Sequence, residues 1–447
     1  MTSNFCKIIN SIFSCFLDIK KVFFFFLFFI IVFPKIPLIS TGFNVSIRLE
    51  DFIIVYLWIL LGIYILNGKI KISKNIIFFW IGAYLLWGLI STMIGSFRGE
   101  ITTLLFFLRR IEYISLFFFG YILIDKENLS KFYNLIFISF GAVALIGFFQ
   151  YFKVFNLLGI AQKFISYLQP ANIRFWVPTS KVISSTFDGN YDFGAYLILI
   201  VPFLLLLLLN YRYSHKKMLF LGFLSSMILI SLSGARTPTI IIFGTVVAIF
   251  VKRILTGPKK QIFISFLIFI LLISIFSITS KTVLINFLGR VENLQELNYE
   301  GIQRFLHTDQ SMISRMEKWS LTWNSFLANP LFGIGFGGFS EHYIGADNQY
   351  IQTLGEIGLI GLFLFLIIFF YVIKMNNQTR RYLKRIPSDK AKELDKIFLL
   401  ALSIGILGLM LDGITINTFD SSKIAMCLWI FIGVATKLNA LYEPKNN

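Results

Sequence analysis

Long apolar runs, separated by short polar or charged stretches, recur along most of this sequence. A helix needs about 20 mostly apolar residues to cross a hydrocarbon core of roughly 30 Å. Twelve runs near that length are bounded by charge, glycine or proline, and each predicts a membrane-spanning helix. They lie near residues 22–40, 51–67, 75–95, 101–124, 132–152, 191–210, 218–232, 237–251, 261–279, 353–373, 397–411 and 424–434. The predicted fold is therefore all-α, a polytopic membrane protein of about 12 transmembrane helices.

Composition agrees with this pattern. Of the 447 residues, 57% are hydrophobic and only 14% are charged, and the mean hydropathy is +0.77. A soluble enzyme, a DNA-binding module or a secreted disulfide scaffold needs a polar surface that this chain does not provide, so we expect no nucleic-acid partner. What the net charge of +18 indicates depends on which side of the membrane the Lys and Arg residues lie. The 3 cysteines indicate neither a disulfide framework nor a metal cluster.

Orientation follows from the connections, because loops rich in Lys and Arg stay in the cytoplasm. Most of the 41 Lys and Arg lie in alternate connections, with the largest group in residues 374–396. This bias predicts that both termini are cytoplasmic. Two long connections, about 153–190 and 280–352, then lie outside. We divide the chain into membrane helices 1–9 (residues 1–279), an extracytoplasmic loop (280–352), and helices 10–12 with a cytoplasmic tail (353–447).

The second long loop contains an amphipathic pattern. Apolar and aromatic residues recur there at helical spacing up to Asn329-Pro330, which predicts a helix lying on the outer membrane boundary, between transmembrane helices 9 and 10. A glycine-rich stretch that includes Gly335 and Gly337 follows at once, and its backbone freedom would bring amide donors close to a ligand. It is not a nucleotide-binding loop, since no Lys-Ser or Lys-Thr follows it.

Four arginines are candidates for binding an anion. Arg109 and Arg110 interrupt an apolar span, where each costs roughly 2.5–3.5 kcal/mol on insertion scales, so each needs a partner. Either they pair internally, with Glu112 as the nearest carboxylate, or one faces a polar cavity and an anionic substrate. Arg236, in a tight outer connection, and Arg315, on the amphipathic helix, either reach lipid phosphate or hold a phosphate or pyrophosphate group of a substrate.

The candidate acids and bases lie around the start of the tenth span. Asp347-Asn348 and Glu356 bracket that start beside the glycine-rich stretch, where a carboxylate is costly unless it is paired or used. His342 is a further candidate base, although a lone loop histidine is more often a bystander. No metal-ligand spacing such as His-Glu-x-x-His is present, so we expect no metal site.

Three stretches resemble the pattern of the O-antigen ligase and polymerase superfamily. They are the run from Ser314 to Trp319, the run from Asn329 to Phe339, and the run from Asp347 to Gly361. Asp188-Gly189-Asn190, the stretch 233–237 and the basic fourth span support the resemblance. Ligases of this superfamily typically show His-Asn-x-x-Leu where this chain has Asp347-Asn348-Gln349-Tyr350-Ile351. This departure favours a Wzy-like polysaccharide polymerase over a ligase.

The resemblance implies a glycosyltransferase of the all-helical membrane type (GT-C-like) that needs neither metal nor cofactor. Its donor and acceptor would be oligosaccharides linked to undecaprenyl pyrophosphate, at an active site on the outer face of the cytoplasmic (inner) membrane. Arg236 and Arg315, with Arg109 or Arg110, would bind pyrophosphate, and Asp347 or His342 would orient or deprotonate the acceptor. A chain-length regulator is a further candidate partner. The alternatives are a ligase that transfers polymer to a lipid A core and a flippase for the same lipid-linked sugar.

Overall fold

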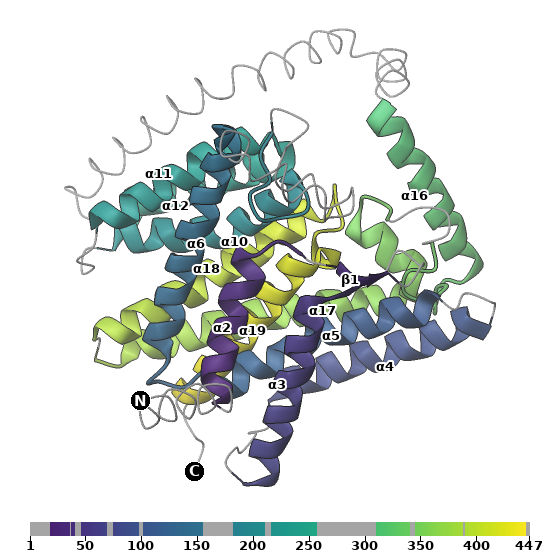
Figure 1. Cartoon of the computed structure of the whole chain (residues 1–447), viewed down its shortest axis with the longest axis horizontal. Helices are drawn as coiled ribbons and strands as arrows, with labels where there is room; N and C mark the ends of the chain where they lie inside the picture. The colour runs from purple at the N-terminus through teal and green to yellow at the C-terminus, as the bar shows by residue number, and fades with distance from the viewer. Residues whose placement is uncertain are drawn as a thin grey trace, which may run out of the picture.

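The computed structural model describes residues 18–35, 37–40, 46–68, 75–97, 102–154, 182–210, 216–256, 310–339, 345–387 and 389–443. Within these ranges the chain is almost entirely helical, which confirms the all-α prediction (Figure 1). The helices are α2 (Ile19–Val32), α3 (Leu49–Leu66), α4 (Ile76–Phe97), α5 (Thr102–Leu123), α6 (Leu129–Tyr151), α10 (Asn190–Leu209), α11 (Lys216–Ser233), α12 (Arg236–Thr256), α16 (Gln310–Ala328), α17 (Gln349–Arg385), α18 (Lys390–Asp412) and α19 (Ser422–Tyr442). A short 3-10 helix, η1 (Thr418–Asp420), precedes α19.

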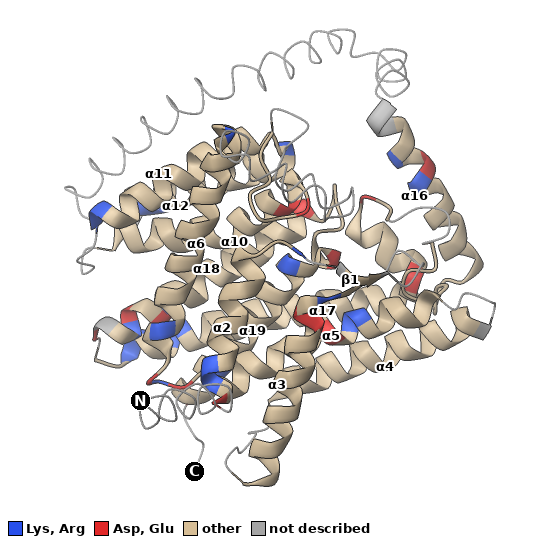
Figure 2. Cartoon of the chain, viewed as in Figure 1, with Lys and Arg blue, Asp and Glu red and all other residues tan. Residues whose placement is uncertain are grey.

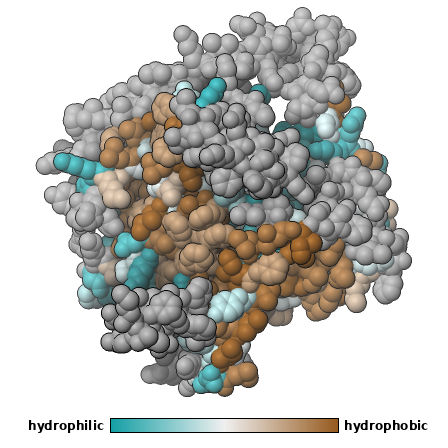
Figure 3. Space-filling model, in the orientation of Figure 1, coloured by the Kyte–Doolittle hydropathy of each residue, from teal (hydrophilic) through white to brown (hydrophobic). Residues whose placement is uncertain are grey.

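Among the described residues, nine helices are long and apolar enough to cross a membrane. Eleven of the twelve predicted spans coincide with described helices, and the twelfth, 261–279, lies outside the described residues. Figure 2 shows charged residues near many helix ends, with others along α16 and within α5. Large apolar side chains such as Phe52, Phe79 and Leu86 are exposed. Figure 3 shows the broad apolar area on one face. In a multi-pass membrane protein such a surface faces lipid.

The first predicted span is wrong beyond residue 32. Helix α2 ends at Val32, and the chain continues as strand β1 (Pro37–Ser40), which pairs antiparallel with β2 (Ser46–Arg48). Pro34 and Pro37 explain the early end, because proline removes a backbone donor and disfavours helical geometry in the residue before it. Leu38, Ile39 and Ile47 of this small hairpin are exposed, and the hairpin leads directly into α3.

The centre of the bundle is the contact between α5 and α19. Two glycines make it close: a side chain at Gly120 would overlap the backbone oxygen of Ile430, and one at Gly433 would overlap that of Phe117. Small residues at such crossings let helix backbones approach, which is how membrane helices gain packing without help from the hydrophobic effect. Helix α19 is the most fully buried of the nine candidate spans in the described ranges.

Helix α17 runs well beyond the predicted span 353–373. It begins at Gln349, is kinked at Gly358, and continues to Arg385 past the basic residues that mark the end of the apolar run. Helix α16, the predicted amphipathic helix, packs against α17 at the edge of the bundle (Figure 1). The starts of α10, α12 and α17 share one end of the bundle with η1, through the contacts described below, and this end holds the candidate site.

Candidate active site at the start of helix α17

Asn348 and Asp347 form a fixed corner where the chain enters α17. The Asn348 side chain caps the helix, since its Oδ1 accepts hydrogen bonds from the backbone nitrogens of Tyr350 and Ile351, both at 3.0 Å. Asp347, one residue earlier, has φ 51°, a left-handed conformation that few residues other than glycine adopt. Backbone strain of this kind clusters at functional sites, because the surrounding structure must hold it in place.

Helix α16 provides the contacts of Asp347. Lys318 lies 3.0 Å from the Asp347 carboxylate, and the indole nitrogen of Trp319 donates to the backbone oxygen of Ala346 at 2.7 Å. Thr322, one turn further, is buried against Gly355 of α17. Arg315 precedes Lys318 by three residues and therefore shares this helix face. The packing of α16 thus directs the face that carries Arg315 toward the Asp347 corner.

Arg236 is connected to the same corner from the other side. The turn after α18 accepts a hydrogen bond from Asn348 Nδ2 at the backbone oxygen of Ile414, at 2.9 Å. One residue later, the hydroxyls of Thr415 and Thr237 are 3.0 Å apart. Thr237 follows Arg236, which is exposed at the start of α12. One short turn therefore joins the starts of α17 and α12, and it places Arg236 at the end of the bundle that holds Asp347.

Glu356 lies inside the protein, about two turns into α17, and is 3% exposed. Its Oε1 accepts hydrogen bonds from the backbone nitrogen of Gly337 at 3.0 Å and from Gln352 Nε2 at 2.7 Å. The backbone nitrogen of Gly335 donates to the backbone oxygen of Glu356 at 2.8 Å. The two glycine amides that the sequence suggested as ligand donors therefore bond to α17, and Glu356 fixes the glycine-rich stretch beneath the corner.

Two glycines make this packing possible. Gly333 and Gly358 both have φ 70°, and each approaches the backbone of the other segment: a side chain at Gly333 would overlap the carbonyl of Glu356, and one at Gly358 would overlap that of Leu331. The left-handed conformation alone costs a non-glycine residue roughly 1–2 kcal/mol. Only glycine satisfies both the conformation and the contact.

Gly358→Ala is expected to lower the unfolding temperature of the detergent-purified protein markedly. The free-energy cost of the left-handed conformation and the cost of the overlap with Leu331 add to each other. Gly141→Ala in α6 is the matched control, since nothing lies within 4 Å of that position. There the change should be neutral or slightly stabilising, because alanine is the better helix former. Equal unfolding temperatures for the two variants would contradict the role given to Gly358.

Arg110 and Asp420 connect the corner to the middle of the bundle. The guanidinium of Arg110 on α5 is 2.6 Å from Asp420 Oδ1, and the two side chains are 15% and 20% exposed. Gln349 Nε2 donates to the same carboxylate at 3.2 Å, and Gln352 Nε2 lies 3.4 Å from its other oxygen. The Arg110 guanidinium also lies 5.2 Å from the centre of the Phe336 ring. This buried network holds α5, α17 and η1 together.

Arg109 is paired as well. Its Nη1 lies 2.7 Å from Asp51 of α3 and 2.7 Å from Glu112, the carboxylate that the sequence suggested, and its Nη2 donates to the backbone oxygen of Ser46 at 2.6 Å. Both arginines of α5 therefore have carboxylate partners within the protein. Their arrangement fits the internal-pairing alternative. Of the four predicted arginines, Arg236 and Arg315 are then the two that have no carboxylate partner among the described residues.

The stretch before α10 joins the same end of the bundle. Asn190 donates to the backbone oxygen of Ser233 at 2.9 Å, so two stretches that support the superfamily resemblance are in direct contact. Asp188 pairs with Lys35. Burial acts to raise the pKa of Asp188, but the cation of Lys35 outweighs it and holds the pKa below its usual value. The buried ammonium of Lys423 donates to the backbone oxygens of Phe33 and Thr186 at 2.5 and 2.6 Å.

His342 lies outside the described residues, so its predicted role stays a prediction. Within the ranges that the structure describes, no three His, Cys, Asp or Glu side chains are grouped to hold a metal ion. Sequence reasoning did not select Lys318 or Gln352, which contact Asp347 and Glu356. Lys318 lies inside the first of the three superfamily-like stretches, three residues after Arg315, and this spacing was the signal available.

Residues 221–366 match the protein family described as O-Antigen ligase. The predicted superfamily resemblance is confirmed. The matched segment includes Arg236, α16, the glycine-rich stretch and the Asp347 corner, whereas Arg110 and Asp420 lie outside it. A search of curated proteins found no match. The O-antigen ligase family match supports a ligase- or polymerase-type function, carried out by a glycosyltransferase-like membrane enzyme.

Proposed function

We propose that the chain is a polysaccharide polymerase, a metal-independent glycosyltransferase that joins repeat units linked to undecaprenyl pyrophosphate on the outer face of the cytoplasmic membrane. The observation that carries this proposal is the position of Asp347. Its carboxylate contacts Lys318, one turn after Arg315 on α16, and its neighbour Asn348 bonds to the turn that contacts Thr237 beside Arg236. A carboxylate at the same end of the bundle as two arginines without a described carboxylate partner suits an acceptor hydroxyl next to a pyrophosphate.

In the proposed reaction, the hydroxyl oxygen of the acceptor sugar forms a bond to the anomeric carbon of the donor sugar. The bond from that carbon to the pyrophosphate oxygen breaks, and the electron pair leaves with the lipid pyrophosphate. Asp347 accepts the hydroxyl proton. Arg236 and Arg315 bind the pyrophosphate oxygens, where negative charge increases in the transition state, and fixed cations at that place lower the barrier.

In the proposal, other residues hold this arrangement, some of them predicted from the sequence and some found only in the structure. Asn348 caps α17 and so fixes the direction of Asp347, and Lys318 holds its carboxylate from α16. Glu356 anchors the glycine-rich stretch, and Arg110 anchors Asp420 beside Gln349. These are positioning residues, since each acts on the reacting groups through another side chain.

A ligase is the second candidate function, and the description of the matched family as O-Antigen ligase favours it. In this case the same site would transfer a finished polymer to a lipid A core. The residue at position 347 favours the polymerase, because ligases of the superfamily typically have histidine where this chain has Asp347. Both functions use the same leaving group, and they differ in the acceptor.

The two candidates are separated by the glycans of a strain that lacks the protein, compared with the same strain carrying the wild-type chain. We expect single repeat units on the surface core and no long polymer, as the loss of a polymerase requires. Long polymer that remains on the lipid carrier, with a bare core, would show a ligase. Repeat units retained on the cytoplasmic side would show that the protein moves its substrate and is no transferase.

A further inference from the structure

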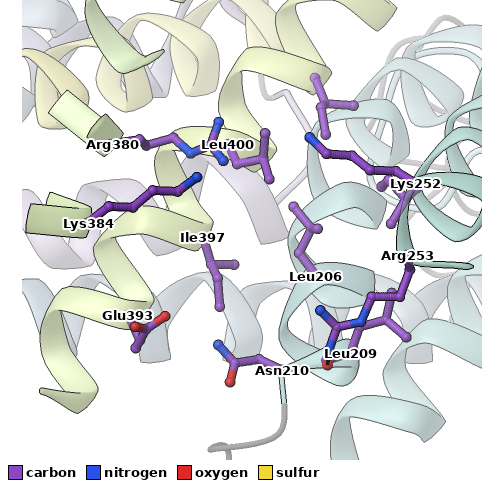
Figure 4. Close-up of a pocket in the computed structure, with 12 residues that line it drawn as sticks. Leu206, Leu209, Asn210, Lys252, Arg253, Arg380, Lys384, Glu393, Ile397 and Leu400 are labelled. Carbon is purple, nitrogen blue, oxygen red and sulfur yellow. Dashed lines mark hydrogen bonds between the residues drawn. The ribbon is translucent and has the colours of Figure 1, made fainter. Parts of the chain in front are cut away.

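A pocket of about 560 Å³, drawn in Figure 4, is lined by residues of α10, α12, α17 and α18. It lies at the end of the bundle opposite the candidate site. Helices α10, α12 and α17 end around it and α18 begins there, whereas the candidate site lies where α10, α12 and α17 begin. Leucine and isoleucine side chains form much of its wall, among them Leu206, Ile249 and Ile404. Its volume lies in the range of small-molecule and lipid headgroup sites.

Four cations line this pocket: Lys252 and Arg253 from α12, and Arg380 and Lys384 from α17. Figure 4 shows Arg380 and Lys384 extending from one side toward Lys252 on the other. One carboxylate, Glu393, also lines it. Its charge is already offset, since Lys396 lies 2.5 Å from it. The described lining of the pocket therefore carries an excess of positive charge, which a ligand with negative charge would offset.

Arg380 indicates that a ligand belongs between these cations. One terminal nitrogen of its guanidinium donates to Asn377 at 3.2 Å. Its Nε is buried and has no hydrogen-bond acceptor among the described residues. A guanidinium presents donors in a fixed plane that matches the oxygens of a phosphate group. A phosphate placed between Arg380, Lys384 and Lys252 would accept a hydrogen bond from the Arg380 Nε, for which the described residues provide no acceptor.

A second hollow distinguishes a lipid from a free anion. It has a volume of about 540 Å³ and runs along α12, lined by Gly244, Val247, Ala248, Val251 and Leu255. Lys252 lines both hollows, so the cationic pocket adjoins, at this residue, an apolar groove on α12, where Ile240, Val251 and Leu255 are exposed. An inorganic phosphate would make no apolar contacts in such a groove. The acyl chain of a phospholipid would pack against its apolar side chains.

We propose that this pocket binds one anionic phospholipid. Lys252, Arg380 and Lys384 hold its phosphate group, and the groove along α12 receives an acyl chain. Basic pockets between membrane helices recognise anionic headgroups in this manner, by charge and by the planar donors of arginine. The site is separate from the candidate active site, and its occupant stays bound during turnover instead of reacting.

The test measures binding of fluorescent phosphatidylglycerol to the purified full-length protein, with phosphatidylcholine as the neutral comparison. We expect one phosphatidylglycerol per protein, no comparable retention of phosphatidylcholine, and binding weakened about tenfold or more in R380Q/K384Q. The matched control is R381Q/R385Q, which removes the same charge from the same helix end at two residues that do not line the pocket. The control should bind phosphatidylglycerol as the wild type does.

K252Q provides an independent variant on α12 and decides the result if R380Q/K384Q does not fold. Equal binding by R380Q/K384Q and R381Q/R385Q, or by K252Q and wild type, would overturn the proposal. So would equal retention of phosphatidylcholine, which would indicate an apolar surface without headgroup recognition. Displacement of phosphatidylglycerol by millimolar inorganic phosphate would assign the pocket to a free anion, and persistence of the lipid in that buffer supports the phospholipid.

Discussion

Arg236→Ala is expected to lower the rate of polymer formation by about 10²–10³-fold at normal protein levels, because it removes one fixed cation from the departing pyrophosphate. Arg315→Ala should have a loss of the same order, since the α16 face that carries it packs beside Asp347. Arg236→Lys should fall between wild type and alanine, because lysine keeps the charge but loses the two-oxygen contact. Polymer length on a gel, with lipid-linked intermediates quantified by mass spectrometry, is the readout.

The matched control for the loss of charge is Arg381→Ala, an exposed arginine in the last turns of α17. It lies at the opposite end of the helix from Asp347, so polymer formation should be unchanged. Full polymer length in Arg236→Ala and Arg315→Ala, with protein levels equal to wild type, would refute the assignment of these arginines to pyrophosphate.

Asp420→Ala is expected to destabilise the folded protein by roughly 3–5 kcal/mol, because it leaves the Arg110 guanidinium buried without its carboxylate. It also removes the acceptor of Gln349 in the first turn of α17. Activity should therefore fall in whatever protein remains folded, since the turn that fixes Asp347 loses its support. Thermal unfolding in detergent and polymer formation per amount of folded protein measure the two effects.

Asp125→Ala is the matched control for this change. Lys20 and Asp125 are also 2.6 Å apart, but their side chains are 44% and 38% exposed, against 15% and 20% for Arg110 and Asp420. Exposed ion pairs contribute about 0–1 kcal/mol. The Asp125 carboxylate also accepts from the backbone nitrogen of Asn128 at 3.1 Å, and loss of such a cap costs about 0.5–2 kcal/mol, so Asp125→Ala should cost less than Asp420→Ala. If the two alanine variants unfold at the same temperature, burial of the Arg110–Asp420 pair adds nothing to the cost of breaking it, and the prediction is wrong.

The membrane helices were predictable because their cause is local. A run of apolar residues long enough to cross a bilayer forms a helix whatever the rest of the chain does, and the described spans follow that rule. The ends were less predictable. Helix α17 continues to Arg385 because Lys, Arg, Gln and Leu are good helix formers, so the helix outlasts the apolar run that marked it. Proline ended α2 before the apolar pattern did.

The residues of the site were predictable as types, but their partners were not. An arginine inside a span demands a carboxylate, and Glu112 was close enough in sequence to be suggested for Arg109. Asp420, the partner of Arg110, lies on a different helix connection near the other end of the chain, and neither periodicity nor spacing indicates such a pair. The acceptors of the Gly335 and Gly337 amides were unpredictable for a similar reason, because they lie on α17 and only the packing of the glycine-rich stretch against that helix reveals them.

Lys423 illustrates what charge rules miss. The orientation argument expects cations mainly in cytoplasmic connections, yet this lysine begins α19 at the end of the bundle that holds the site, buried and bonded to the backbone of two distant segments. Loop charges predict topology well because they act during insertion. Lys423 is instead held by backbone carbonyls of the folded structure, a kind of contact that the count of loop charges does not consider.

The central place of α19 also has a consequence for biosynthesis. Chains fold from the N-terminus as they are made, and of the helices described here α19 is synthesised last, although it fills the middle of the bundle against α5. The helices synthesised earlier must therefore leave the position of α19 beside α5 unoccupied until α19 is made. Asp420, directly before α19, reaches Arg110 only when that place is filled. Nascent and truncated chains would then lack an ordered site, so that transfer begins only after synthesis of the membrane domain is complete.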